Sequence, residues 1–212
     1  MNAFIFFVSH FSKKVFASAC ALSLMVIFNS NSQAGTWHRP DRATVIFRGN
    51  IEVDELQRFQ KVFDSDVREL IVTSAGGDTQ AALQIAESLE KNNIRIVVKI
   101  WCLSSCANYF FTAATERIID KGIVGFHGSM AGCSPMRNRE EKIKEVAKQN
   151  NLSEEQVREA IKANLVWEDR ELAFFGRRGV SRELFDRSCT PDKGMHNGKS
   201  YSFLLPSNKT FE

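Results

Sequence analysis

The chain has 212 residues, of which 43% are hydrophobic and 25% are charged, a balance typical of a folded globular protein and not of a disordered one. Its 28 basic and 25 acidic residues give a formal net charge of +3 at pH 7. A charge this small argues against a nucleic-acid-binding protein, so we expect no nucleic acid among its partners.

Residues 1–34 have the order of a secretory signal peptide: Lys13 and Lys14, an apolar run over residues 15–28, then small residues at Ser32 and Ala34. The apolar run is shorter than the roughly 20 residues of a membrane-spanning helix, which favours cleavage near Ala34 over an uncleaved anchor. Cleavage would remove only two of the 28 basic residues, which leaves 26 against 25 acidic ones and a net charge of +1. The sequence thus predicts a secreted or periplasmic protein, without a stable membrane span, whose residues 35–212 form a single domain.

Four cysteines would remain after cleavage: Cys102, Cys106, Cys133 and Cys189. An even number in an exported chain predicts two disulfides, with three connectivities open. A zinc site is a weaker interpretation, because the close pair Cys102 and Cys106 has no second close-spaced pair of ligands. We expect neither a metal nor a cofactor.

Hydrophobic runs alternate with stretches of helical spacing after the signal peptide. Strands are expected at residues 43–48, 69–73, 94–101, 117–120 and 123–127. A helix is expected at residues 52–63, with Val53 on its apolar face, and another at 79–91, where Ala82, Ile85 and Leu89 lie on one apolar face. A third helix is expected at 105–115 and is apolar almost all round. The run 94–101 lacks simple alternation, as expected for a strand that is covered on both faces.

Charged helices follow, at residues 139–149, 153–164, 166–176 and 181–188, and a last strand is expected at 201–205. Ser153 and Gln156 form a capping box for the second of these helices. Alternating strands and helices predict one α/β domain with a sheet covered on its faces, and the helices of residues 139–188 would be a lid or a packing appendage.

Three segments lie at the ends of predicted strands and could contribute to one reaction: residues 74–78, 104–106 and 125–128. Taken singly, a glycine turn, a serine N-cap and a strand histidine usually have structural roles. Together they could supply backbone N–H donors, a nucleophile and a base. His127 is the only histidine expected on a strand, whereas His38 and His196 lie in polar, loop-like surroundings.

Residues 70–129 resemble the Clp-protease proteolytic subunit and its relatives in the Clp/crotonase superfamily, especially an exported bacterial branch. The pair Gly76-Gly77 stands where that family has a glycine pair after a strand. Leu103-Ser104-Ser105-Cys106 matches the family's nucleophile segment, with Ser105 as nucleophile, and His127 in Gly-Phe-His-Gly matches its base. A looser match late in the chain places the acidic residue at Asp192.

The resemblance implies a Clp/crotonase-like spiral of ββα units with a helical C-terminal appendage. It implies an exported serine hydrolase, most of all a peptidase acting on peptides or proteins, with Ser105, His127 and Asp192 as its triad. Backbone N–H groups of Gly76, Gly77 and Cys106 would form the oxyanion hole. Members of this superfamily form rings or trimers, so the resemblance also implies a possible homo-oligomer.

This chain also departs from the family pattern. Ala75 replaces a proline, Asn108-Tyr109 replaces small residues in the helix, and the helical insertion before Asp192 is longer. Ser104 is a rival nucleophile, because a shift of one residue in the match around Cys102 and Cys106 would select it. A Ser–His pair without an acidic partner is also open. The rivals of Asp192 are Asp186, Glu168 and Asp169.

Other classes compete with a peptidase. A disulfide between Cys102 and Cys106 could misplace Ser105 and leave an inactive binding or scaffold protein on the same fold. Acyl-CoA chemistry is disfavoured by export, and a Ser–Lys mechanism with Lys99 or Lys121 is disfavoured by His127. Cys133 and Cys189 are expected close to the site.

Overall fold

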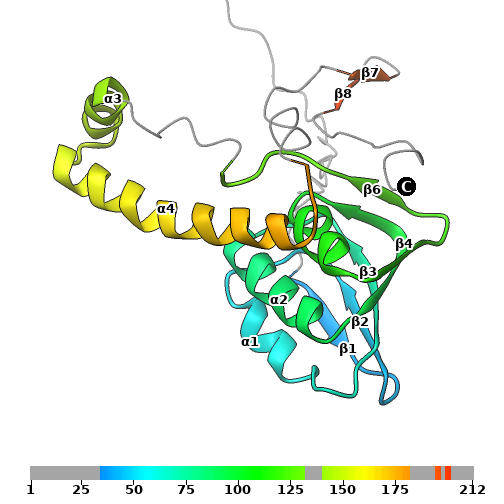
Figure 1. Ribbon diagram of the computed structural model, residues 1–212. Coiled ribbons are helices and arrows are strands. Elements are labelled where there is room, and N and C mark those ends of the chain that lie inside the picture. Colours follow the sequence, from blue (N-terminus) through cyan, green and yellow to red (C-terminus); the bar gives the residue numbers. More distant parts are fainter. Residues whose placement is uncertain (1–33, 132–139, 182–193, 197–198, 202–212) are drawn as a thin grey trace, which may run out of the picture. The chain divides into compact units, whose positions relative to one another are not determined.

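The computed structural model describes residues 34–131, 140–181, 194–196 and 199–201 (Figure 1). The chain divides into the units Met1–Asn31 and Ser32–Glu212, and the structure described here belongs to the second. The signal peptide expected at residues 1–34 lies almost wholly outside the described residues and stays a prediction. Within the described ranges, no helix has both the length and the apolar character needed to cross a membrane.

A six-stranded sheet has the order β1-β2-β3-β4-β5, with β6 beside β4. The strands are β1 (Thr36–His38), β2 (Thr44–Arg48), β3 (Glu69–Ser74), β4 (Arg95–Leu103), β5 (Glu116–Ile119) and β6 (Ile123–Gly125). β1 runs antiparallel to β2, and the other pairs are parallel. The sheet confirms the α/β class, with one antiparallel strand that the sequence did not predict.

The helices are α1 (Glu55–Gln60), α2 (Thr79–Lys91), the π-helix η1 (Cys106–Phe111), α3 (Glu140–Asn150) and α4 (Glu154–Arg177). α4 is one continuous helix where two were predicted, because neither glycine nor proline interrupts residues 154–175. Its predicted capping box between Ser153 and Gln156 is confirmed. α1 is shorter than predicted, and Val53, expected on its apolar face, is 82% exposed before the helix begins.

The main hydrophobic core lies between the sheet and the helices, and a smaller cluster lies between α3 and α4. Figure 1 shows α1, α2 and the carboxyl end of α4 on the same side of the sheet. The predicted apolar face of α2 is confirmed, since Ala82, Ile85 and Leu89 are buried. Phe47 of β2 is fully buried, and its ring centroid lies 4.4 Å from that of Trp37 and 6.0 Å from that of Phe110. These contacts join the antiparallel edge of the sheet to η1.

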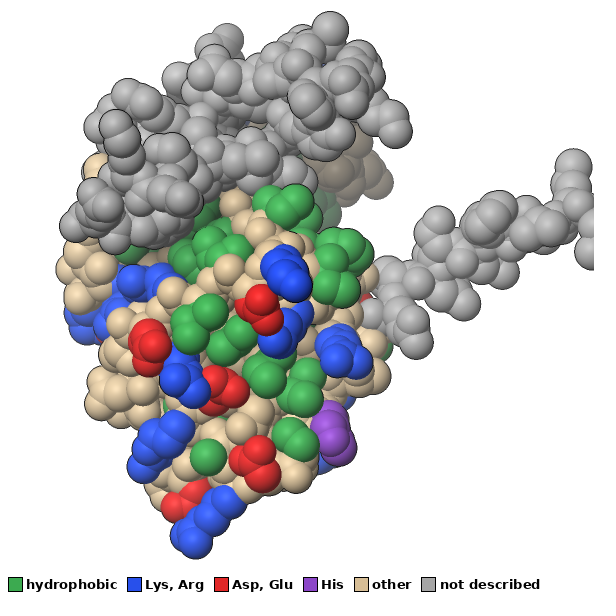
Figure 2. Space-filling model, turned by 90° about the vertical axis from the view of Figure 1, so that its right-hand side faces the viewer, with side chains coloured by type: hydrophobic (Ala, Val, Ile, Leu, Met, Phe, Trp, Pro, Cys, Tyr) green, Lys and Arg blue, Asp and Glu red, His purple; other side chains and the backbone are tan. Residues whose placement is uncertain are grey.

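The opposite face of the sheet is not covered by helices within the described part of the chain, so the prediction of two covered faces is wrong for these residues. Figure 2 shows hydrophobic side chains on this face, interspersed with charged ones. The large exposed hydrophobic residues of β4, β5 and β6 are Ile100, Trp101, Ile118, Ile119 and Ile123. The pairing of β4 is itself irregular: the β3–β4 register shifts between Val72, which pairs with Val98, and Ser74, which pairs with Cys102, so that β4 has extra residues at this point.

The last part of the chain is described only in short pieces. β7 (Gly194–His196) pairs antiparallel with β8 (Lys199–Tyr201). The helix expected at 181–188 falls outside the described residues except for Ser181, and the strand expected at 201–205 except for Tyr201.

Replacing Phe47 by alanine should lower the free energy of unfolding by about 3–5 kcal/mol, because the change opens a cavity between β1, β2 and η1. Urea denaturation followed by circular dichroism measures the loss. The control is Val166→Ala on α4, where the side chain is 67% exposed and a change within about 0.5 kcal/mol is expected. Equal losses in the two variants would contradict the proposed core.

Candidate active site

The three segments singled out in the sequence meet at one edge of the sheet, as predicted. β3, β4 and β6 are parallel, so their carboxyl ends point the same way, and they lead to Gly76, Ser104 and His127. Leu103 pairs with Gly125, and the N–H of Ser104 donates to the carbonyl oxygen of Gly125 at 2.9 Å. This pairing brings the serine segment beside the histidine segment.

Glycine is required at both positions of the turn that follows β3. A Cβ on Gly76 would lie 2.7 Å from the carbonyl oxygen of Leu103 and 2.9 Å from the nitrogen of Ser105, and its φ is +94°. A Cβ on Gly77 would lie 2.0 Å from the carbonyl oxygen of Ile51, with φ at +145°. The two glycines therefore allow the backbones of three neighbouring segments to pack closely.

Ile51 fastens the glycine turn from the other side. Its N–H donates to the carbonyl oxygen of Gly76 at 2.9 Å, and its carbonyl oxygen accepts from the N–H of Asp78 at 2.7 Å. Asp78 in turn caps α2, because its side chain accepts from the N–H of Ala81. The turn is thus held by the segment after β2, by β4 and by α2 together.

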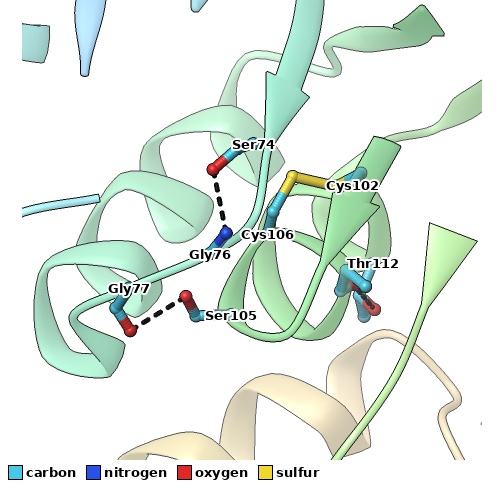
Figure 3. Close-up of a disulfide and its surroundings, with 8 residues drawn as sticks. Ser74, Gly76, Gly77, Cys102, Ser105, Cys106 and Thr112 are labelled. Atoms are coloured by element: carbon cyan, nitrogen blue, oxygen red, sulfur yellow. Dashed lines mark hydrogen bonds between the residues drawn. A yellow bond between two sulfur atoms is a disulfide. The ribbon is translucent and has the colours of Figure 1, made fainter. Parts of the chain in front are cut away.

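The serine segment is a sharp strand-to-helix turn that a disulfide closes. Ser104 has a left-handed backbone with φ at +55°, which is uncommon for a residue other than glycine. Cys102 and Cys106 form a disulfide with a Cα–Cα distance of 5.2 Å, and both residues are fully buried (Figure 3). Cys133 and Cys189 lie outside the described residues, so a second disulfide stays a prediction.

Ser105 is buried, and its hydroxyl donates to the carbonyl oxygen of Gly77 at 3.1 Å (Figure 3). A hydroxyl has one proton to donate, so in this conformation the proton is not directed at His127. Attack on a substrate would need a rotation of the Ser105 side chain. The rival Ser104 is half-buried.

The three backbone N–H groups predicted to bind an oxyanion differ in whether they already donate a hydrogen bond within the protein. The N–H of Gly76 donates to the hydroxyl oxygen of Ser74 at 3.0 Å. The N–H of Gly77 has no hydrogen-bond acceptor among the described residues, and Gly77 is exposed. Cys106 begins η1, where backbone N–H groups lack partners within the helix. Gly77 and Cys106 therefore carry the N–H groups that remain for an oxyanion.

His127 lies in the loop after β6 and not on the strand, because β6 ends at Gly125. The other two histidines of residues 35–212, expected in loops, lie on strands: His38 on β1 and His196 on β7. His127 is half-buried, and this burial lowers the pKa of its imidazole. The neutral imidazole, which can accept a proton, is therefore favoured at pH 7.

A buried polar clamp, formed by Asn108, Tyr109 and Glu171, holds the histidine loop. The side-chain amide of Asn108 donates to the carbonyl oxygens of His127 at 3.0 Å and Gly128 at 2.6 Å. The Tyr109 hydroxyl donates to the Glu171 carboxylate at 2.5 Å. That carboxylate also accepts from the backbone N–H groups that follow the loop, of Met130 at 3.2 Å and Ala131 at 2.7 Å.

The polar clamp joins η1 and α4 to the loop through three buried side chains. Burial raises the pKa of the Glu171 carboxyl, against the effect of its hydrogen-bond donors, and it raises the pKa of Tyr109. In the sequence, Asn108 and Tyr109 stand out only as departures from a family pattern, and Glu171 was not predicted as a site residue. The available signal was a glutamate on the helix face that also carries Phe174 and Phe175.

The third member of the predicted triad stays a prediction. Asp192 and the rival Asp186 lie outside the described residues. Glu168 is buried one turn before Glu171 on α4, whereas Asp169 is exposed. Of the rivals within the described ranges, only Glu168 is therefore buried on the helix that holds the histidine loop.

The structure gives less support to a Ser–Lys mechanism or a metal site at the sheet edge that carries Ser105. Lys99, the candidate base of a Ser–Lys mechanism, forms an ion pair with Asp120 at 2.6 Å. Within the described residues, no group of three or more His, Cys, Asp or Glu side chains is arranged to hold a metal ion.

No protein-family model and no curated protein matches this chain. Among solved structures, a point mutant of ClpP1 from Listeria monocytogenes is similar at 19% identity and a TM-score of 0.37, over 56% of this chain and 78% of that one. A probable enoyl-CoA hydratase/isomerase from Mycobacterium abscessus is similar at 12% identity and a TM-score of 0.32, over 57% of this chain and 52% of that one, about half its length. With both TM-scores below 0.5, neither likeness supports an argument about activity, and the α/β class rests on the sheet and helices themselves.

Replacing Glu171 by leucine should lower the free energy of unfolding by at least about 1–3 kcal/mol, because Tyr109 and two backbone N–H groups lose their acceptor. Glu171→Gln keeps an acceptor oxygen and should lose less. Urea denaturation gives the free energy, and hydrogen exchange at Met130 and Ala131 should become faster. The control Glu159→Leu makes the same change at an exposed site of α4, and an equal effect there would contradict the role of the polar clamp.

Proposed function

We propose that this chain is an exported serine hydrolase that cleaves peptide bonds. The observation that carries the proposal is the meeting of Ser105, the exposed N–H of Gly77 and the histidine loop at one sheet edge. The segments follow three different strands, and the side chain of Asn108, three residues after Ser105, donates to the backbone carbonyl oxygen of His127. A purely structural turn does not require this combination.

In the proposed reaction, the Ser105 side chain turns from Gly77 so that His127 accepts its proton while Oγ attacks the substrate carbonyl carbon. The carbonyl electron pair moves onto the oxygen, where N–H groups of Gly77 and Cys106 stabilise the negative charge. His127 then gives its proton to the leaving amine as the carbon–nitrogen bond breaks. Water, deprotonated by His127, hydrolyses the acyl-enzyme and restores Ser105.

Asp192 remains the proposed partner that orients and stabilises the imidazolium, and Glu168 is its rival. The polar clamp contributes differently, because it fixes the backbone of the histidine loop at Asn108 and Glu171. A fixed loop reduces the number of conformations that His127 can adopt, which favours a productive geometry.

The alternative is an inactive binding or scaffold protein on the same fold. Two observations favour it: the Ser105 hydroxyl donates to Gly77, and the buried disulfide between Cys102 and Cys106 closes the turn around it. A stiff turn could prevent the rotation that attack requires. The two functions differ in whether Ser105 is reactive.

Export and assembly are parts of the same proposal. The Cys102–Cys106 disulfide supports an oxidising compartment, in agreement with a secreted or periplasmic protein cleaved near Ala34. The exposed hydrophobic residues of β4, β5 and β6 support a homo-oligomer, because such patches often mark contact surfaces. The proposed reaction needs no cofactor.

A fluorescent phosphonate probe should label the wild-type protein at Ser105, and the Ser105→Ala variant should not be labelled. Mass spectrometry of the digest identifies the modified residue, and peptide hydrolysis should fall by at least about 10³-fold in the variant. Ser104→Ala is the matched control and should keep most of the labelling. Labelling at Ser104 would reassign the nucleophile, whereas no labelling at either serine would favour the inactive protein.

The rate constant kcat/KM for peptide hydrolysis should fall toward acid pH, with an apparent pKa below the ordinary histidine value of 6.5. The sign follows from burial, which disfavours the imidazolium and keeps His127 neutral to lower pH. Initial rates measured between about pH 4.5 and 8, a range that spans the titration of histidine, give the pH profile of kcat/KM. An acid limb centred above 6.5 would contradict the assignment of His127.

A further inference from the structure

A groove beside the candidate site is built by two short segments. It has a volume of about 480 Å³ and is lined by residues 50–53, which precede α1, and by residues 75–78 of the glycine turn. Gly77, whose N–H is the proposed oxyanion donor, is one of the lining residues. A substrate that places a carbonyl oxygen at this N–H would therefore extend into the groove.

The lining carries two carboxylates, of Glu52 and Asp78, and it includes no lysine, arginine or histidine. Asp78 is engaged in capping α2. Glu52 makes no ion pair or side-chain hydrogen bond within the described part of the chain, and it is only partly exposed. The free charge of the groove is therefore negative and belongs mainly to Glu52.

The nearest cation of α1 does not neutralise Glu52. Arg58 contacts Asp54 at 2.6 Å and Glu55 at 3.3 Å, and it also donates to the carbonyl oxygen of Gly35. The positive charge of Arg58 is thus paired with the carboxylates of Asp54 and Glu55 and not with that of Glu52.

The position of Glu52 relative to the candidate site is fixed by its backbone. Its N–H donates to the buried Glu55 carboxylate at 3.1 Å, and that carboxylate also accepts from the Trp37 indole at 2.7 Å. The preceding residue, Ile51, is hydrogen-bonded to Gly76 and Asp78. The backbone that carries the Glu52 carboxylate is therefore fixed beside the proposed oxyanion donor.

The groove also has an apolar part. Val53, 82% exposed, and Ala75 lie in its lining. Lysine and arginine combine a long apolar stem with a cationic end, so the stem could lie along Val53 while the cation meets Glu52.

We infer that this groove binds a lysine or arginine side chain of the peptide substrate, with Glu52 as the residue that determines specificity. The inference rests on the proposed function for its substrate, and it goes further by naming the class of side chain that is selected. The attraction acts between partly exposed charges, so it should weaken as the salt concentration rises.

The test uses binding, so that it does not depend on turnover. Octapeptides that differ at one position, with lysine, norleucine or glutamate, are titrated into the Ser105→Ala protein and followed by fluorescence anisotropy. The lysine peptide should bind about tenfold more tightly than the norleucine peptide at low salt, a preference that corresponds to one charge-assisted contact. Glu52→Gln should abolish this preference, and Glu52→Lys should reverse it toward glutamate.

Asp54→Asn is the matched control, because it removes an acid two residues away that pairs with Arg58 and does not line the groove. It should keep the preference for lysine. Equal binding of all peptides, no binding of any, or equal loss in the Asp54 and Glu52 variants would overturn the inference. Selective lysine binding without phosphonate labelling of the wild-type protein would refute the hydrolase and leave the groove as a binding site for basic peptides.

Discussion

The close approach of Gly76 to the backbone at the end of β4 is the constraint on which the candidate site depends. A Cβ at this position would meet the backbone of Leu103 and Ser105, so only glycine lets the two turns pack together. The hydroxyl of Ser105 can then reach Gly77, and Ile51 can bond on the other side of the same turn. Three segments that are distant in sequence become one surface because backbone, and not side chains, fills the space between them.

The polar clamp adds a second constraint, of a different physical kind. Burying a carboxylate costs free energy unless hydrogen bonds compensate for lost water, and Glu171 has such bonds from Tyr109, Met130 and Ala131. A hydrophobic residue would avoid this cost only if the three donors were also absent, because Tyr109 and two backbone N–H groups would otherwise lose their acceptor. The arrangement is therefore better explained by the need to hold the histidine loop in one place than by stability alone.

The two faces of the sheet differ in a way that bears on assembly. One face packs on helices and forms the core, whereas the other carries exposed hydrophobic side chains interspersed with charged ones (Figure 2). The groove with Glu52 lies at the strand ends, next to the glycine turn. Contact between copies over the open face and substrate binding at the edge would thus use different residues.

Local patterns in the sequence determined most strands, the apolar face of α2, the capping box at Ser153 and the order of the three chemical segments. These features depend on neighbouring residues, so periodicity and turn chemistry suffice to predict them. Tertiary structure alone decided which proton donor and acceptor meet: Ser105 with Gly77, Asn108 with the histidine loop, and Glu171 with Tyr109, 62 residues away. It also decided that no helix of the described ranges covers one face of the sheet and that Glu52 lies beside Gly77, because such contacts follow from the packing of distant segments, which no local pattern records.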